Sequence, residues 1–138
     1  MRTDQKNALG TRGNGGAIIN VTSTLGYLPY KGFPIYVASK HAALGFLRSI
    51  ADPELMKKTN LRLLTICPGY TDTSFVVVQH RHEFSLAEQG EPIPPQHPQT
   101  VADSVIIAIE SNKWVGFWRC DQNKIDEIEL LCCKIVEQ

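Results

Sequence analysis

Hydrophobic residues along the chain fall into short blocks separated by turn-forming residues, and each block predicts one element. Residues 17–21 are a short apolar run after a glycine-rich stretch, which predicts a buried strand. A helix is predicted from Pro34, because proline is favoured in a first helical turn. Pro53 interrupts the helical pattern, so we expect a kink or a restart with Asp52 as N-cap. Asn60 can end this helix in a left-handed conformation.

The second half of the chain continues the alternation of strands and helices. Residues 61–66 predict a second apolar strand, closed by Cys67-Pro68-Gly69. Thr100 is the expected N-cap of a helix that runs to about Ser111, with Asp103 as its acidic first-turn residue. Residues 114–120 predict a third strand. Strands that alternate with helices are typical of an α/β fold with a parallel sheet.

Three further segments have less regular sequence patterns. Residues 72–99 form a long, proline-containing segment with a weak helical pattern over residues 83–89. Residues 13–16 are rich in glycine but precede a strand, whereas a phosphate-binding loop follows a strand, so we interpret them as a connection. The tail carries apolar residues at helical spacing, which predicts an amphipathic helix: Ile125, Ile128, Leu131 and Ile135.

Composition narrows the class of protein. The chain has 138 residues, which suits one small domain, and 43% hydrophobic against 20% charged residues is typical of a globular protein. The formal net charge is zero and no basic block occurs, so we expect neither a nucleic-acid partner nor a membrane surface. No apolar stretch approaches the length of a bilayer span, and the polar N-terminus does not resemble a signal peptide. We therefore expect a cytoplasmic protein.

Cysteines and histidines give no sign of a metal site. No two cysteines have the spacing of a C-x-x-C pair, so we expect reduced thiols in packed positions: Cys67, Cys120, Cys132 and Cys133. His80 and His82 flank Arg81 in a polar stretch, which is more typical of a solvated loop than of a metal ligand set.

Tyr36 and Lys40 are the first candidates for chemistry. They stand four residues apart on the predicted helix and so share one face. A phenol has a pKa near 10, and a neighbouring ammonium favours the phenolate, which lets tyrosine exchange a proton with an alcohol or carbonyl oxygen. Ser23 ends the strand before this helix and Pro68-Gly69 ends the next strand. Both motifs therefore fall at strand carboxyl ends, where open α/β sheets bind ligands.

Three sequence blocks carry a resemblance to a known family. They are Ile18-Ile19-Asn20-Val21-Thr22-Ser23, Tyr36-Val37-Ala38-Ser39-Lys40 and Cys67-Pro68-Gly69-Tyr70-Thr71-Asp72-Thr73. In this order and spacing the chain resembles the short-chain dehydrogenase/reductase family, and most closely its 15-hydroxyprostaglandin dehydrogenase-like and insect alcohol dehydrogenase-like members. The resemblance covers residues 16–75 and fades beyond them.

The resemblance implies a role for each matching residue. Tyr36 would be the general acid/base, Lys40 would assist it and hold the nicotinamide ribose, and Ser23 would bind the substrate oxygen. The nicotinamide end of the cofactor would be lined by Pro68, Gly69, Thr71 and Thr73. The implied cofactor is NAD, with NADP left open. The implied substrate is a small apolar alcohol or ketone, and residues 74–99 would either cover it or simply pack on the sheet.

The chain also departs from the family. The family's glycine-rich turn, its Asn-Asn-Ala-Gly element and its catalytic asparagine precede the serine strand and have no counterpart here. The resemblance thus implies one partial domain over residues 1–138: the C-terminal portion of a Rossmann-like parallel sheet, with the N-terminal nucleotide-binding strands missing. We expect an apolar sheet edge and an incomplete cofactor site. Phe33 replaces a glutamine common in prostaglandin dehydrogenase-like members.

Two functions follow from this interpretation. The first is an oxidoreductase that transfers hydride between NAD(H) and a secondary alcohol or carbonyl compound, using Ser23, Tyr36 and Lys40. The second is a truncated, non-catalytic chain that associates with an intact homologue. The resemblance implies a homo-oligomer for the full-length form, because the helix that begins near Pro34 commonly builds the family's dimer face.

Overall fold

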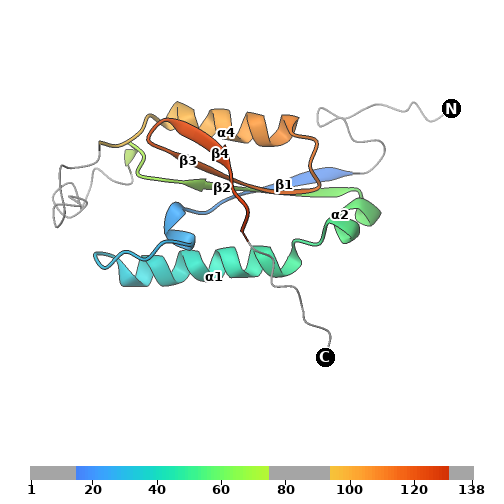
Figure 1. The fold of residues 1–138 in the computed structure, drawn as a ribbon, viewed down its shortest axis with the longest axis horizontal. Helices are drawn as coiled ribbons and strands as arrows, with labels where there is room; N and C mark the ends of the chain where they lie inside the picture. Colours follow the sequence, from blue (N-terminus) through green and yellow to red (C-terminus); the bar gives the residue numbers. More distant parts are fainter. Residues whose placement is uncertain (1–14, 75–93, 131–138) are drawn as a thin grey trace.

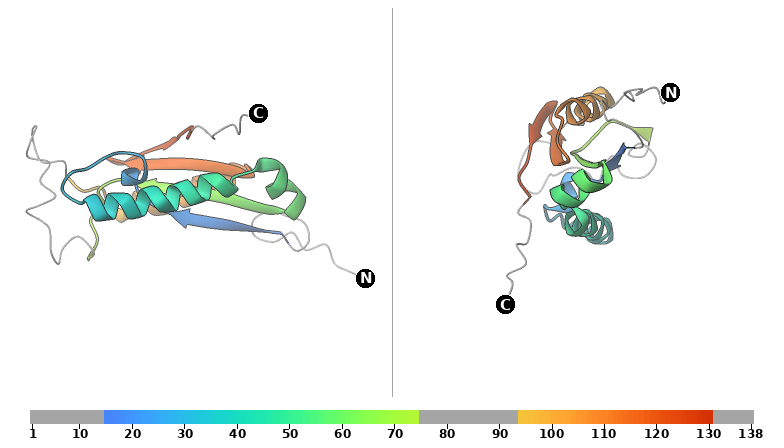
Figure 2. Two further views of the ribbon diagram at one scale, coloured as in Figure 1. Left: turned by 90° about the horizontal axis from the view of Figure 1, so that it is seen from below. Right: turned by 90° about the vertical axis from the view of Figure 1, so that its right-hand side faces the viewer.

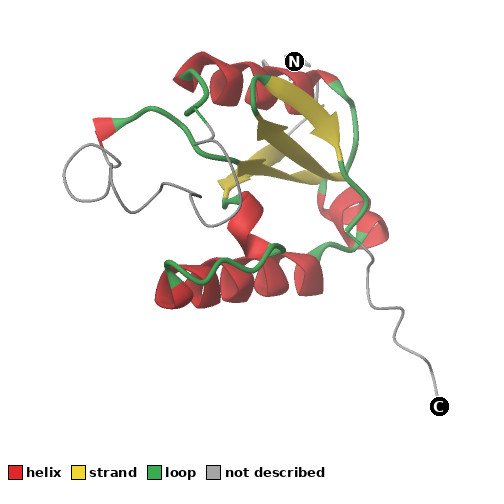
Figure 3. Cartoon of the chain, turned by 60° about the vertical axis from the view of Figure 1, so that its left-hand side comes forward, coloured by secondary structure: helices red, strands yellow, loops and turns green. Residues whose placement is uncertain are grey.

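The computed structural model describes residues 15–74 and 94–130, which form a four-stranded sheet between two layers of helices (Figure 1). The strands lie in the order β1 (Gly16–Val21), β2 (Leu61–Pro68), β3 (Val115–Asp121) and β4 (Lys124–Glu127). The first three are parallel, which confirms the predicted sheet, and β4 pairs antiparallel with β3. Helix α4 (Pro98–Glu110) covers one face, and α1 (Pro34–Ile50) and α2 (Pro53–Thr59) lie on the other (Figure 3).

Strand β2 is buried on both faces, which explains its almost continuous apolar sequence. Leu63 points to the side of α1 and α2, and Leu64 points to the side of α4. Two cores result. The first contains Leu44, Leu47, Ala51, Met56, Leu63 and Phe117. The second contains Leu64, Ile66, Ala108, Trp118 and Cys120.

The break between α1 and α2 follows the sequence prediction. Pro53 opens α2, and the Asp52 carboxylate accepts a hydrogen bond of 2.9 Å from the Glu54 amide. Asp52 is thus the N-cap, because its side chain satisfies an amide that the helix leaves unpaired. Asn60 ends α2 with φ 55° and ψ 33°, in the predicted left-handed conformation. The turn that results leads directly into β2.

Helix α4 begins earlier than the sequence suggested. The N-cap is His97, whose Nδ1 accepts a hydrogen bond of 3.1 Å from the Gln99 amide, so the assignment of Thr100 as N-cap was wrong. The reason is Pro98, which holds the residue before it in an extended conformation and is itself well suited to a first helical turn. Asp103 consequently lies beyond the first turn, which contains no acidic residue.

The predicted tail helix was also wrong in the part that the structure describes. Gln122 and Asn123 both have positive φ, 49° and 59°, and they turn the chain back so that Lys124 pairs with Asp121. A two-residue turn of this kind matches the twist of a hairpin, so residues 124–127 form a strand despite their helical spacing. Leu131 and Ile135 lie outside the described residues, as do residues 83–89.

The two edges of the sheet differ in character, and Figure 2 shows them on opposite sides. Strand β4 carries Lys124, Asp126 and Glu127, whereas β1 carries exposed apolar side chains. Ile18 and Val21 are each 50% exposed. The strand at residues 17–21 is therefore confirmed, but its predicted burial was wrong, and the apolar edge expected from the resemblance is present. Charged edge strands resist unwanted pairing, and β1 lacks this protection.

Arg62 is a buried cation inside the otherwise apolar β2. It is 3% exposed and donates to three carbonyls at the end of α4: Lys113 O at 2.8 Å, Ile109 O at 2.9 Å and Ala108 O at 3.1 Å. Helix carbonyls at a C-terminus lack intrahelical partners and carry partial negative charge. Arg62 therefore caps α4 and attaches it to the sheet.

Within the described residues, no helix is long and apolar enough to cross a membrane. The same part of the chain holds no cluster of three His, Cys, Asp or Glu side chains suited to a metal ion. Cys67 and Cys120 are buried free thiols, as predicted. The other two cysteines and the pair His80 and His82 lie outside the described residues.

Candidate active site

Ser23 lies where β1 and β2 end side by side. Its side chain is 7% exposed and accepts a hydrogen bond of 3.1 Å from the Leu25 amide, which caps the short 3₁₀ helix η1 (Thr24–Gly26). Its Oγ also donates to Pro68 O over 3.4 Å. Two motifs 45 residues apart in sequence therefore meet at the carboxyl edge of the sheet, the edge at which α/β sheets bind ligands.

Gly26 connects this edge to helix α1. A Cβ atom added at Gly26 would lie 3.1 Å from Lys40 O, 3.2 Å from Leu44 Cδ2 and 3.3 Å from Thr22 Oγ1. Such contacts are tighter than ordinary van der Waals packing. The turn of α1 that carries Lys40 therefore rests directly on η1, the element that Ser23 caps.

Tyr36 and Lys40 contact each other on the exposed side of α1. The Lys40 Nζ lies 5.4 Å from the centroid of the Tyr36 ring, within the range of a cation–π interaction. Both side chains are half-buried. In the described parts of the chain, no hydrogen bond joins the Tyr36 hydroxyl to Ser23. The structure thus pairs Tyr36 with Lys40 and Ser23 with Pro68, and Gly26 brings the backbone of Lys40 close to η1.

A second tyrosine, Tyr27, stands near the site but differs in environment. Its hydroxyl is buried without a hydrogen-bond partner. Burial raises the pKa of Tyr27 to about 12, and the neighbouring Cys67 adds to the rise. Tyr27 therefore stays protonated at neutral pH and is unsuited to act as a base.

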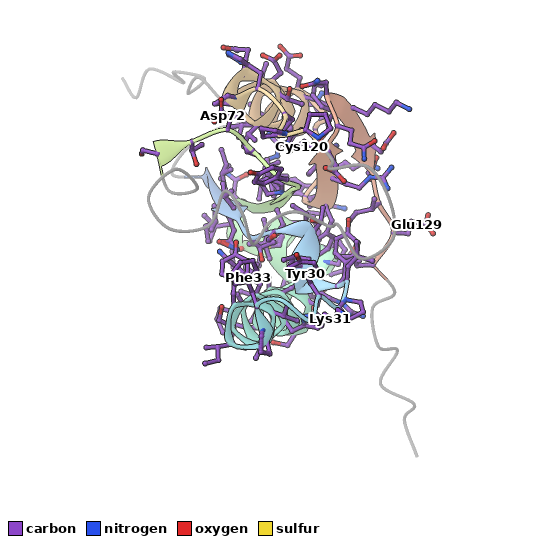
Figure 4. All side chains as sticks on the ribbon, turned by 90° about the vertical axis from the view of Figure 1, so that its left-hand side faces the viewer. Tyr30, Lys31, Phe33, Asp72, Cys120 and Glu129 are labelled. Atoms are coloured by element: carbon purple, nitrogen blue, oxygen red, sulfur yellow. The ribbon has the colours of Figure 1, made fainter. Side chains whose placement is uncertain are left out.

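Two aromatic residues line the loop that leads into α1. The rings of Tyr30 and Phe33 lie 5.7 Å apart with an interplanar angle of 33°. Gly32 lies under this pair, since an added Cβ would come within 2.7 Å of Tyr30 Cε1. Figure 4 shows Tyr30 and Phe33 beside α1, with Asp72 and Cys120 toward the α4 side. The loop between Ser23 and Tyr36 thus presents an aromatic surface.

Gly69 packs closely against the side chain of Asp121. Its amide donates to Cys120 O over 2.8 Å. A Cβ atom added at Gly69 would lie 1.9 Å from Asp121 Oδ1. Any side chain at this position would therefore have to displace the Asp121 carboxylate packed against Gly69.

Thr71 and Thr73 differ in how far their hydroxyls are available. Thr71 Oγ1 donates to Gly69 O and accepts from Gln96 Nε2, both over 3.0 Å. Because its single hydrogen is already donated, the Thr71 hydroxyl cannot donate to a ligand, and Thr71 can offer mainly its backbone. Thr73 is exposed and two residues farther along. Backbone groups and one free hydroxyl suit a carboxamide and a phosphate, so this edge fits the nicotinamide end of a dinucleotide.

Gln96 and Asp121 are site residues that the sequence did not reveal. Gln96 is 1% exposed and pairs with Thr71 through a parallel bridge, although 25 residues separate them. Neither residue belongs to a recognisable motif. Their positions follow from tertiary pairing, for which the local sequence carries no signal.

The amino-acid sequence matches the model of a known protein family. The family model for short chain dehydrogenase matches residues 6–83, more than half of the chain. The chain belongs to the short-chain dehydrogenase family. It is 35% identical over 113 residues to 15-hydroxyprostaglandin dehydrogenase [NAD(+)] of Mus musculus, which covers 75% of this chain and 42% of that protein. It is 45% identical over 104 residues to alcohol dehydrogenase 1 of Ceratitis cosyra, covering 72% of this chain and 40% of that protein.

Solved structures agree with the family assignment. A short chain dehydrogenase from Burkholderia cenocepacia J2315 in complex with NADP matches with a TM-score of 0.55 and 26% identity. The match covers 75% of this chain and 38% of that one. This member of the short-chain dehydrogenase family therefore spans less than half the length of the relatives and the structure it matches.

Proposed function

We propose that this chain is part of an oxidoreductase that transfers hydride between NAD(H) and a secondary alcohol or carbonyl compound. The proposal is supported by the Tyr36–Lys40 contact, by the Ser23–Pro68 hydrogen bond, and by Gly26, which brings the Lys40 backbone against the 3₁₀ helix that Ser23 caps. We further propose that residues 1–138 form a single partial domain of the family.

Ser23 would bind the substrate oxygen. Its hydrogen bond to Pro68 O is long, at 3.4 Å, so the hydroxyl can rotate from that carbonyl to a substrate at little cost. A donor that is already positioned by the Leu25 amide stabilises negative charge as it develops on the oxygen. Ser23 thus contributes binding and charge stabilisation without transferring a proton.

Tyr36 would move the proton. Its phenolate would take the proton from an alcohol, or its protonated hydroxyl would give one to a carbonyl oxygen, and the Lys40 ammonium would stabilise the phenolate form. The 5.4 Å separation of Lys40 Nζ from the ring centre supports this pairing. When bound, NAD(H) supplies or accepts the hydride, which protein side chains cannot do.

The cofactor and substrate class are proposals of the same kind. NAD is favoured because a relative is named for NAD(+), while the NADP in a matching structure keeps NADP open. Gly69, Thr73 and the Thr71 backbone would hold the nicotinamide end. The aromatic pair Tyr30 and Phe33 supports a small apolar alcohol or ketone as substrate. We propose a cytoplasmic location and, for the full-length form, a homo-oligomer.

A non-catalytic chain that associates with an intact homologue is the second candidate function. Exposed apolar side chains favour it: Ile35 is 85% and Phe46 is 63% exposed on α1, and β1 ends the sheet with Ile18 half exposed. Apolar surface of this kind marks interaction sites. Association of the two chains in size-exclusion chromatography would support this function.

Calorimetric titration with NADH separates the two functions. We expect Lys40→Met to weaken NADH binding about tenfold, because the lysine would hold the nicotinamide ribose. Lys57→Met is the matched control, since Lys57 is exposed on α2, away from this edge. Equal affinities for the two variants would contradict the enzyme function. No binding by the chain alone, together with association with a homologue, would favour the second.

A further inference from the structure

The backbone of Gly69 is enclosed by a ring of hydrogen bonds. The Gly69 amide donates to Cys120 O over 2.8 Å, and Gly69 O accepts from Thr71 Oγ1 over 3.0 Å. One side chain closes the ring: Gln96 Nε2 donates to Cys120 O over 2.9 Å and to Thr71 Oγ1 over 3.0 Å. We call Gly69, Thr71, Gln96 and Cys120 the Gly69 network.

The direction of every bond in the Gly69 network is determined. The Gln96 amide nitrogen can only donate, and it uses both of its hydrogens. Thr71 Oγ1 must then accept from Gln96, so its own hydrogen points to Gly69 O. Cys120 O accepts two bonds, from the Gln96 side chain and from the Gly69 amide. Replacing the side-chain amide of Gln96 would therefore weaken the hydrogen bonds of both the Gly69 amide and the Gly69 carbonyl.

Gln96 also holds the chain on either side of Thr71. The backbone amide of Gln96 donates to Tyr70 O over 2.8 Å, and its backbone carbonyl accepts from the Asp72 amide over 3.0 Å. In a parallel bridge of this type the partner residue's own backbone groups face away, so those of Thr71 point away from Gln96. Gln96 thus fixes the residues proposed to face the cofactor without lying among them.

The burial of Gln96 argues that these bonds matter. The side chain is 1% exposed, yet its Oε1 has no hydrogen-bond partner. An unpaired buried carbonyl costs free energy that an apolar side chain of the same length would avoid. The two hydrogen bonds of the side-chain amide nitrogen therefore explain why this buried position holds a glutamine.

We propose that Gln96 is a positioning residue that fixes the Gly69 backbone at the cofactor edge. It acts through the Thr71 hydroxyl and the Cys120 carbonyl and does not touch the reacting atoms. The cofactor part of this inference rests on the proposed function, whereas the hydrogen-bond part does not. The two parts can therefore be tested separately.

Amide hydrogen exchange of the chain tests the hydrogen-bond part. Gln96→Met keeps the length of the side chain and removes its donors, so the Gly69 amide should exchange about tenfold faster. The Leu63 amide, bonded to Trp114 O in the middle of β2, reports on global unfolding and should change less. Thr100→Val is the control, because it removes a buried hydrogen-bonding side chain, bonded to Asn123, outside the network.

A second variant keeps the inference testable if Gln96→Met does not fold. Thr71→Val leaves Gln96 in place and removes the link to Gly69 O, and it should also accelerate exchange at Gly69. If Gly69 exchange is unchanged in a folded Gln96→Met or Thr71→Val chain, or accelerates no more than in Thr100→Val, the inference is wrong.

Steady-state kinetics test the cofactor part. Gln96→Met should raise the KM for NAD about tenfold with kcat nearly unchanged, because Gln96 acts on cofactor placement and not on proton transfer. A purely structural role would lower the active fraction and reduce kcat alone. Faster Gly69 exchange with an unchanged KM would overturn the positioning role. A wild-type chain without turnover would count against the proposed function, and the exchange result would still decide the hydrogen-bond part.

Discussion

The cap that Arg62 places on α4 gives a prediction whose size can be worked out from the structure. Arg62→Met keeps the aliphatic length of the side chain and removes three hydrogen bonds to the carbonyls of residues 108, 109 and 113. A hydrogen bond from a charged donor contributes about 1.5 kcal/mol or more, so the three together exceed about 4 kcal/mol. Burial lowers the pKa of the Arg62 guanidinium, because removing the charge from water is unfavourable. Removing that charge returns part of the loss, and we expect Arg62→Met to cost about 3 kcal/mol.

Arg119→Met is the matched control for this prediction. Arg119 lies on the neighbouring strand β3, and its ion pair with Asp126 has side chains that are 45% and 46% exposed. Exposed ion pairs contribute at most about 1 kcal/mol, so the control should lose far less stability. Urea unfolding followed by tryptophan fluorescence measures both variants, since Trp118 is buried beside α4. If both variants lost the same free energy of unfolding, Arg62 would not act as the cap described.

Three other predictions concern the site and the hairpin. Gly69→Ala should cost about 2 kcal/mol or more by urea unfolding, and Asp121→Ala in the same chain should recover part of the loss, because the added Cβ meets the Asp121 carboxylate; no recovery would argue against that contact. Burial raises the pKa of the Cys67 thiol from 9.0 to about 12, so its contribution to stability is complete below pH 9 and is lost as the pH rises toward 12. Urea midpoints across this range should fall less steeply in Cys67→Ala than in wild type, and equal slopes would contradict the shift. Gln122→Gly should raise the free energy of unfolding in urea by up to about 1 kcal/mol, because glycine adopts the positive φ without strain; a lower free energy of unfolding would refute this.

The fold was largely predictable because local signals agreed with the tertiary structure. Pro53, Asp52 and Asn60 each act through their own backbone or the next two residues, so their roles could be inferred without knowing the packing. The tail failed for the opposite reason. Ile125 and Ile128 have helical spacing, but a two-residue turn places Ile125 in β4 and Ile128 just after it. Ile125 packs against the core on the α4 side, and Ile128 packs against the core on the α1 side.

The candidate site was predictable only where a motif carried it. Ser23, Tyr36 and Lys40 could be named from their order and spacing, but the contact of Ser23 with Pro68 joins residues 45 positions apart. Gln96 could not be found, because its importance comes from bonds to residues on other elements. The resemblance placed Thr71 beside the cofactor, but its hydroxyl donates to Gly69 O and accepts from Gln96, which only the tertiary structure reveals.

The proposed function depends on Tyr36 as the residue that exchanges the proton while hydride moves between NAD(H) and a secondary alcohol or carbonyl compound. Comparing turnover by Tyr36→Phe with turnover by Tyr27→Phe tests it most directly, because each variant removes one phenolic hydroxyl and little else. We expect Tyr36→Phe to lower kcat by about 100-fold or more, and Tyr27→Phe, whose hydroxyl is buried and unpaired, to retain it. Full turnover by Tyr36→Phe would contradict the claim.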